Sequence, residues 1–236
     1  MKIRSLLPVY VLTVSLVLVT TYLGGEIVTT MAQGGVGSGR TCVVIDAGHG
    51  GIDGGATSCS GVLESHLNLN IAERLDALVR LLGYDALMIR TTDTSIHTEG
   101  HTIAAQKVSD LKNRVSMANG TEGAILVSIH QNIYPDPRYG GAQVFYAKTP
   151  WSMELAKQLQ ENFAQYLDRN NKRACKPAKG IYLMEQIIKP AVLIECGFLS
   201  NPDDDRRLND PGYQKKLASV IGATLAQMTE QAPLRS

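Results

Sequence analysis

The feature that most constrains this chain is the alternation of short apolar runs with stretches of helical periodicity. The runs 43–45, 124–129 and 191–194 are short enough for buried strands. Between the first two, apolar residues recur at steps of three and four from Leu67 to Leu82, and the glycine that follows is placed to end a helix. Alternating strands and helices predict an α/β fold, a single domain with a mixed, largely parallel sheet flanked by helices.

The remaining segments continue the same alternation. Further strands are predicted at 86–90 and 142–146, and the polar stretches 91–108 and 169–179 are predicted as loops. Helices are predicted at 111–118, at 150–167, and after the cap-and-proline pairs Asn201-Pro202 and Asp210-Pro211.

Composition supports a globular body and excludes other classes of protein. Hydrophobic residues make up 44% of the 236 residues and charged residues 19%, which excludes a mostly disordered or collagen-like chain. The formal net charge is +1, and the body contains no basic run. Because phosphate contacts dominate nucleic-acid affinity, we expect no nucleic-acid partner.

The N-terminal segment predicts export. Lys2 and Arg4 precede an apolar run at 6–23, which is the pattern of a positive region followed by a hydrophobic one. The length of the run fits both a cleaved signal peptide and a membrane anchor, and both readings stay open. The positive end stays inside, so the rest of the chain is expected outside the cytoplasmic membrane, tethered or released. The resulting boundaries are a signal or membrane-contacting anchor at 1–32, a linker at 33–40 and a folded domain at 41–230.

The four cysteines carry little chemistry by themselves. None forms a Cys-x-x-Cys pair, which disfavours a zinc ribbon or a thioredoxin motif. Cys42 and Cys196 stand in strand-like apolar runs and are predicted as buried, unreactive thiols. Cys59 and Cys175 stand in loop-like stretches, where a disulfide between them is the alternative to two free thiols.

Three polar residues stand at or just past predicted strand ends. His49 follows the first strand within the glycine-rich stretch GHGGIDGG, His130 follows the strand at 124–129, and Glu195 follows the strand at 191–194. Glu64 opens the first helix. Because functional sites gather at the carboxyl ends of strands in such sheets, we expect these side chains to meet there.

This set of residues suits a hydrolytic zinc site. Two imidazoles and one carboxylate leave a tetrahedral position for water, and a second carboxylate can act as general base. The simpler alternatives are a phosphate-binding glycine loop, which lacks the usual Lys-Ser/Thr, and unrelated polar residues that are satisfied locally. His97 and His101 form a rival pair four residues apart, but Gly100 between them weakens any helix, so both are predicted as exposed loop residues.

Together these segments resemble the amidase-3 family of zinc-dependent N-acetylmuramoyl-L-alanine amidases. The resemblance covers about residues 41–229 and rests on several motifs in order. These are Ile45-Asp-Ala-Gly-His-Gly-Gly51, Glu64 with Asn68-Leu69, Ser128-Ile-His-Gln-Asn132, Gly141-Ala-Gln-Val-Phe-Tyr146 and the stretch from Pro190 to Pro202 with Glu195-Cys-Gly.

The resemblance implies roles for the candidate residues. His49, Glu64 and His130 would be the ligands of one Zn²⁺ per chain, and Glu195 the catalytic carboxylate. The reaction would be hydrolysis of the amide between N-acetylmuramic acid and L-alanine in peptidoglycan. The sequence is most similar to the spore-cortex, germination-specific group, which implies a step toward muramic-δ-lactam in the forespore envelope. His130 and Glu195 lie only 65 positions apart, which leaves no room for a long inhibitory insert, so control would come from an activator protein or from expression timing.

Two other functions stay open beside this one. Zinc chemistry alone also fits another zinc amide hydrolase, such as a carboxypeptidase or a sugar deacetylase. A non-catalytic, wall-associated sporulation protein could keep the fold, although the presence of Glu195 argues against it. The sequence departs from the family pattern at Ile133 and Glu185, which affects substrate contacts rather than the metal site.

Overall fold

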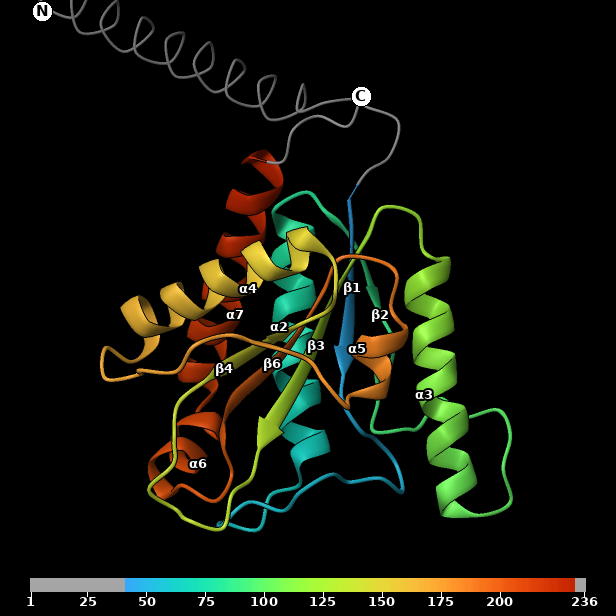
Figure 1. Cartoon of the computed structure of the whole chain (residues 1–236). Helices are drawn as coiled ribbons and strands as arrows, with labels where there is room; N and C mark the ends of the chain where they lie inside the picture. Colours follow the sequence, from blue (N-terminus) through green and yellow to red (C-terminus); the bar gives the residue numbers. More distant parts are fainter. Residues whose placement is uncertain (1–40, 232–236) are drawn as a thin grey trace, which may run out of the picture. The chain divides into compact units, whose positions relative to one another are not determined.

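The sheet sets the position of every candidate residue. The computed structural model describes residues 41–231, and six strands form one sheet in the order β2-β1-β3-β6-β4-β5 (Figure 1). The strands are β1 (Cys42–Ala47), β2 (Asp85–Met88), β3 (Ala124–Asn132), β4 (Gln143–Tyr146), β5 (Lys176–Pro177) and β6 (Ala191–Phe198).

The strand pairing brings the two halves of the site together. β1 pairs in parallel with β2 and β3, and β3 pairs in parallel with β6, whereas β4 runs antiparallel to β6 and parallel to β5. In the β3–β6 register, His130 lies opposite Glu195. The predicted α/β class with a mixed, largely parallel sheet is therefore confirmed.

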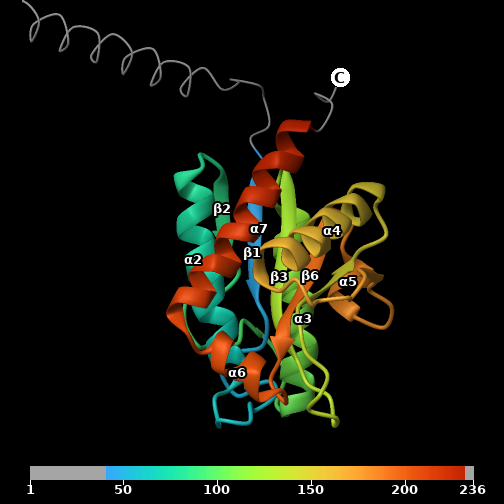
Figure 2. The same ribbon diagram turned by 90° about the vertical axis from the view of Figure 1, so that its left-hand side faces the viewer.

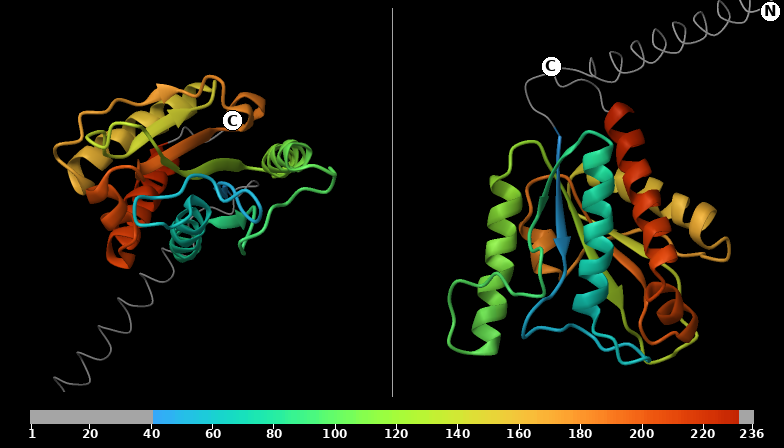
Figure 3. Two further views of the ribbon diagram at one scale, coloured as in Figure 1. Left: turned by 90° about the horizontal axis from the view of Figure 1, so that it is seen from below. Right: turned by 180° about the vertical axis from the view of Figure 1, so that it is seen from behind.

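Helices cover both faces of the sheet (Figures 2 and 3). One face packs against α2 (Glu64–Leu81), α4 (Pro150–Asn162) and α7 (Pro211–Gln231), with a buried core that includes Ile45, Leu75 and Ile221. The other packs against α3 (Ile103–Gly120) and α5 (Tyr182–Gln186). The remaining helices are the π-helix η2 (Phe163–Leu167), which continues α4, and α6 (Pro202–Leu208).

Several predicted boundaries are wrong in informative ways. α3 begins at Ile103, inside the stretch predicted as a loop, because Thr102 caps it by accepting a hydrogen bond from the Ala105 amide at 3.2 Å. Its first turn has good helix formers but no apolar stripe, so periodicity alone misses it. α5 was not predicted either. His130 and Glu195 lie within β3 and β6, not after them, because both strands continue past their apolar runs.

The cysteines and the chain ends complete the account of the fold. All four cysteines are free, so Cys59 and Cys175 form no disulfide, and Cys196 is buried whereas Cys42 is only half-buried. The predicted signal or anchor at 1–32 and the linker at 33–40 lie outside the described residues. Among residues 41–231, no helix has the length and apolar character needed to cross a membrane.

Candidate active site

The loop after β1 presents His49 in an unusual backbone conformation. Its φ is 61°, and among the described residues it is the one non-glycine with positive φ. Two contacts hold it there: Arg114 donates from Nη2 to the His49 carbonyl at 2.7 Å, and the Gly48 amide donates to the Ile129 carbonyl at 3.0 Å. The surrounding fold therefore keeps the imidazole directed at the end of the sheet, at the cost of local strain.

Two glycines of the same loop make room for the site. A Cβ on Gly48 would lie 2.2 Å from the His130 ring, and a Cβ on Gly55, where φ is +69°, would lie 2.6 Å from Glu64 Oε2. A side chain at either position would overlap the imidazole or the carboxylate. The glycine-rich stretch thus lets β1, α2 and β3 bring their polar residues into contact.

His49, Glu64 and His130 converge on one point. Glu64 Oε1 lies 3.3 Å from His49 Nε2 and 3.1 Å from His130 Nδ1, and one ligand atom from each of the three residues lies within 4.8 Å of the others. Ligand atoms about 2 Å from a tetrahedral Zn²⁺ are about 3.3 Å apart, so the spacing fits such an ion. Two nitrogens and one oxygen are also a donor set that zinc accepts.

Glu64 is fixed and kept ionised by its neighbours. Oε2 accepts from the Ala56 amide at 3.0 Å, and Oε1 accepts from the Gln131 amide at 3.1 Å. Burial opposes ionisation of this carboxyl, but hydrogen bonds and charge interactions with His130 and His49 outweigh it and lower the pKa well below its ordinary value. A buried, preoriented carboxylate of this kind is a suitable metal ligand.

A second carboxylate orients His49 from behind. Asp53 Oδ2 lies 3.1 Å from His49 Nδ1, and the Lys107 ammonium on α3 lies 2.9 Å from Asp53 Oδ1. The bond between Asp53 and His49 fixes the imidazole ring and leaves its Nε2 free to face Glu64, an arrangement common behind metal-bound histidines. Neither Asp53 nor Lys107 was identified from the sequence. The sequence signal that could have identified Asp53 is its position in the same glycine-rich stretch, four residues after His49.

Glu195 differs from Glu64 in that one of its carboxylate oxygens is buried without a hydrogen bond to any residue in 41–231. Its Oε2 is buried, and no hydrogen-bond partner for it exists among the described residues. Burial raises the pKa of Glu195 to about 7, and the neighbouring charge of Glu64 raises it too, against the lowering effect of His130 and His49. A bound divalent cation would lower it again, which would leave a carboxylate able to take a proton.

A buried ion-pair cluster supports the loop that carries His49. Arg114, which is 2% exposed, pairs with Asp46 and lies 2.6 Å from Asp110. Ser128 donates to Asp46 at 2.6 Å, and Arg90 donates to the carbonyls of Ala47 and Gly48. The sequence analysis missed these supporting residues, because charge in a polar stretch does not reveal that it will be buried.

The catalytic end opens into a cleft with apolar walls. The cleft has a volume of about 350 Å³, and its lining includes His49, His130 and Glu195. α3 and α5 contribute Leu111 and Leu183 to the walls, and Ile52 comes from the loop after β1. The floor therefore carries the polar chemistry while the walls can exclude water around a bound group.

The other histidines are outside the site. His66 is exposed, and its Nε2 lies 3.1 Å from Asp93 Oδ2. The Nδ1 of His97 lies 2.9 Å from Ser95 Oγ, within hydrogen-bond distance. His97 and His101 lie in the loop before α3, and the metal-compatible group found among residues 41–231 does not include them. Glu185 accepts from the Gly180 amide at 2.8 Å and is also not part of the group.

Comparison with known proteins identifies the family. The sequence profile of the family described as N-acetylmuramoyl-L-alanine amidase matches residues 43–227. The chain belongs to the N-acetylmuramoyl-L-alanine amidase family. This confirms the family and the class of enzyme that the motifs predicted.

Individual relatives support the same assignment. The germination-specific N-acetylmuramoyl-L-alanine amidase of Bacillus subtilis is 39% identical over 181 residues, which is 76% of each chain. The CwlD amidase from Clostridioides difficile, solved in complex with the GerS lipoprotein, is 36% identical with a TM-score of 0.78, covering 81% of this chain and 99% of that one. An N-acetylmuramoyl-L-alanine amidase from Clostridium difficile 630 is 29% identical with a TM-score of 0.73, covering 83% and 100%.

Proposed function

We propose that this amidase cleaves the bond between N-acetylmuramic acid and L-alanine with one zinc ion held by His49, Glu64 and His130. The observation that carries the proposal is the convergence of these three ligand atoms beside a buried carboxylate oxygen that has no partner. When bound, zinc supplies Lewis-acid polarisation of the scissile carbonyl and of a water molecule. The catalytic domain is taken as residues 41–230.

Glu195 carries out both proton transfers, and the neighbouring residues keep the site in place. Glu195 Oε2 accepts the proton of the attacking water, and the same carboxyl returns it to the alanine nitrogen as the amide bond breaks. Asp53 keeps His49 oriented through Nδ1, and Glu64 stays ionised under the hydrogen bonds from Ala56 and Gln131. The apolar cleft walls keep bulk water away from the reacting carbonyl.

The biological setting follows from the relatives. We place the enzyme in spore-cortex maturation, outside the cytoplasmic membrane, where removal of the stem peptide prepares muramic acid for the δ-lactam. The Bacillus subtilis relative is named as germination-specific, and the Clostridioides difficile relative was solved with a lipoprotein. An activator protein of that kind is therefore the expected partner, and the segment at 1–32 is the expected membrane contact.

Digestion of purified sacculi tests the function directly. The zinc-loaded enzyme should release free stem peptides that begin with L-alanine and leave peptide-free muramic acid, both detectable by mass spectrometry. Trimmed stem peptides would instead indicate a carboxypeptidase, and released acetate a deacetylase. A protein that binds sacculi without releasing any product would be the non-catalytic alternative.

A further inference from the structure

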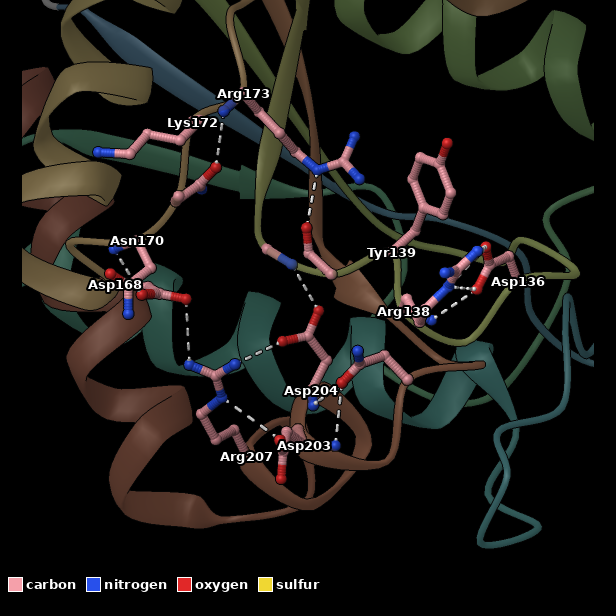
Figure 4. A pocket seen from close by; sticks show the side chains of 14 residues that line it. Asp136, Arg138, Tyr139, Asp168, Asn170, Lys172, Arg173, Asp203, Asp204 and Arg207 are labelled. Carbon is pink, nitrogen blue, oxygen red and sulfur yellow. Dashed lines mark hydrogen bonds and ion pairs between the residues drawn. The ribbon is translucent and has the colours of Figure 1, made fainter.

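A second pocket, separate from the catalytic cleft, has no role in the mechanism above. It has a volume of about 750 Å³, and no residue lines both it and the cleft. We call it the Tyr139 pocket; its walls come from the β3–β4 loop at 136–141, the loop at 168–173 and the start of α6 (Figure 4). Its size is typical of small-molecule sites, and all of its walls are polar or aromatic.

The Tyr139 pocket lies beside the catalytic carboxylate. Gln143 on β4 is the antiparallel partner of Glu195 on β6, and opposite residues in such a pair are about 5 Å apart. Arg173, which lines the pocket, donates from Nη1 to Gln143 Oε1 at 3.1 Å. The buried side chain of Gln143 thus links the pocket wall to the strand position opposite Glu195, which places the pocket next to the candidate catalytic residue.

Two exposed aromatic rings lie side by side here, tilted 55° to each other, and Tyr139 lines the pocket. Tyr134 and Tyr139 are each 47% exposed, and their ring centroids are 4.6 Å apart. The Arg173 guanidinium carbon lies 4.3 Å from the centroid of the buried Phe198 ring and 6.0 Å from the centroid of the Tyr139 ring. Its Nε and Nη1 have protein acceptors, whereas Nη2 has none among the described residues and remains a donor for a ligand.

The charge of the pocket is balanced, which argues against a strongly charged ligand. Four carboxylates face four cationic side chains, and the closest pairs already satisfy one another: Arg138 lies 2.7 Å from Asp136, and Arg207 lies 2.7 Å from Asp204. Three asparagine side chains also line the pocket; those of Asn171 and Asn201 bond to backbone groups, and Asn170 adds a neutral amide. The full charged set is Asp136, Asp168, Asp203 and Asp204 with Arg138, Lys172, Arg173 and Arg207.

We infer that the Tyr139 pocket binds the uncharged N-acetylated sugars that flank the cleaved muramoyl residue in the glycan strand. A pyranose ring has an apolar C–H face for the exposed Tyr139 ring and hydroxyl and amide edges for Asn170 and for Arg173 Nη2. A stem peptide carries carboxylates, and the balanced charge of the pocket gives it no advantage there. This inference rests on the proposed function, since it assigns the position of the glycan in that same substrate.

Two measurements on the zinc-loaded full chain test it. The first is calorimetric binding of an uncharged glycan, an oligomer of N-acetylglucosamine, and, separately, of free stem peptide. The second is kcat/KM on glycan fragments with several sugars compared with a single muramoyl peptide. The variants are Tyr139→Ala and Tyr139→Phe, and the matched control is Tyr166→Ala, which removes a 53% exposed ring outside the pocket lining.

The expected result is selective. Tyr139→Ala should weaken glycan binding by at least about fivefold, as loss of an anchoring aromatic typically does, and should lower kcat/KM more on the multi-sugar substrate than on the single sugar. Tyr139→Phe keeps the ring face and should restore binding, and Tyr166→Ala should match the wild type.

Three other outcomes would overturn the inference without contradicting the proposed function. Equal losses on both substrates would mean a structural role for Tyr139. A loss confined to stem-peptide binding would make this the peptide site, and unchanged glycan binding would remove the pocket from substrate recognition. Only a wild-type enzyme that releases no stem peptide would contradict the function itself.

Discussion

Two neighbouring charged clusters at the carboxyl ends of β1 and β3 are built on opposite principles. The lower cluster lies around Asp46, within β1, and the upper cluster lies further along the chain around His49, just after β1. In the upper cluster, His49, Glu64 and His130 face a common point, and its second carboxylate, Glu195, has a buried oxygen with no hydrogen-bond partner in the part of the chain that the structure describes. In the lower one, Arg114 and Asp46 are almost fully buried and satisfy each other. A buried polar group is costly when unpaired, so the upper cluster is arranged for a ligand and the lower one for support.

The two carboxylates of the upper cluster should show the largest and most separable effects. Glu195→Gln is nearly isosteric but cannot accept the water proton, so the rate should fall by roughly 10²–10⁴-fold while zinc is retained. Glu64→Gln replaces an ionised ligand by a weak neutral one, so zinc itself should be lost. Both are measured as zinc content by atomic absorption and as turnover on sacculi.

The reverse pattern would exchange the two roles. Loss of zinc in Glu195→Gln with retention in Glu64→Gln would make Glu195 the ligand. Near wild-type turnover of Glu195→Gln would show that another group takes the proton.

The lower cluster should respond in stability. Arg114→Met leaves Asp46 buried without its cation, and breaking a buried pair on one side typically costs about 3–5 kcal/mol in the free energy of unfolding. Urea unfolding measures it. Arg206→Met is the control, because its pair with Asp203 is exposed and such pairs contribute about 0–1 kcal/mol. Equal losses in the two variants would show that the cluster does not support the fold as described.

Asp53 connects the upper cluster to its surroundings and should have an intermediate effect. Asp53→Asn weakens the bond that orients His49, and such a change typically lowers metal affinity by roughly 10–100-fold. Competition with a fluorescent chelator measures the zinc Kd. Glu154→Gln, at an exposed pair with Lys157, is the control and should keep the wild-type Kd. An unchanged Kd in Asp53→Asn would limit Asp53 to a packing role.

The sequence is more informative about the candidate site residues than about the residues that support them. The four residues of the candidate site were proposed from the sequence because each follows an apolar run or opens a helix, and because motifs around them match a family. His130 and Glu195 were nevertheless misplaced as following their strands, since polar residues hide the continuation of a strand. The supporting residues Arg114 and Asp53 depend on contacts 65 and 54 positions along the chain, with His49 and Lys107, which local patterns do not contain.

The pH dependence of the free energy of unfolding should distinguish the lower cluster from the upper one. Burial opposes ionisation of Asp46, but the charges of Arg114 and His130 and hydrogen bonds from Ser128 and Arg114 lower its pKa below the ordinary value. A carboxyl whose pKa is lower in the folded than in the unfolded chain stabilises the fold above the unfolded value, about 3.9, and that contribution is lost as pH falls. The gap in unfolding free energy between wild type and Asp46→Asn should therefore be widest near neutral pH and should narrow below about pH 4. Chelator-treated protein is used, because acid also displaces metal from histidine ligands. Asp203→Asn, at the surface, should show no such gap, and a gap for Asp46→Asn that stays constant down to pH 3 would mean that folding does not lower the pKa of Asp46.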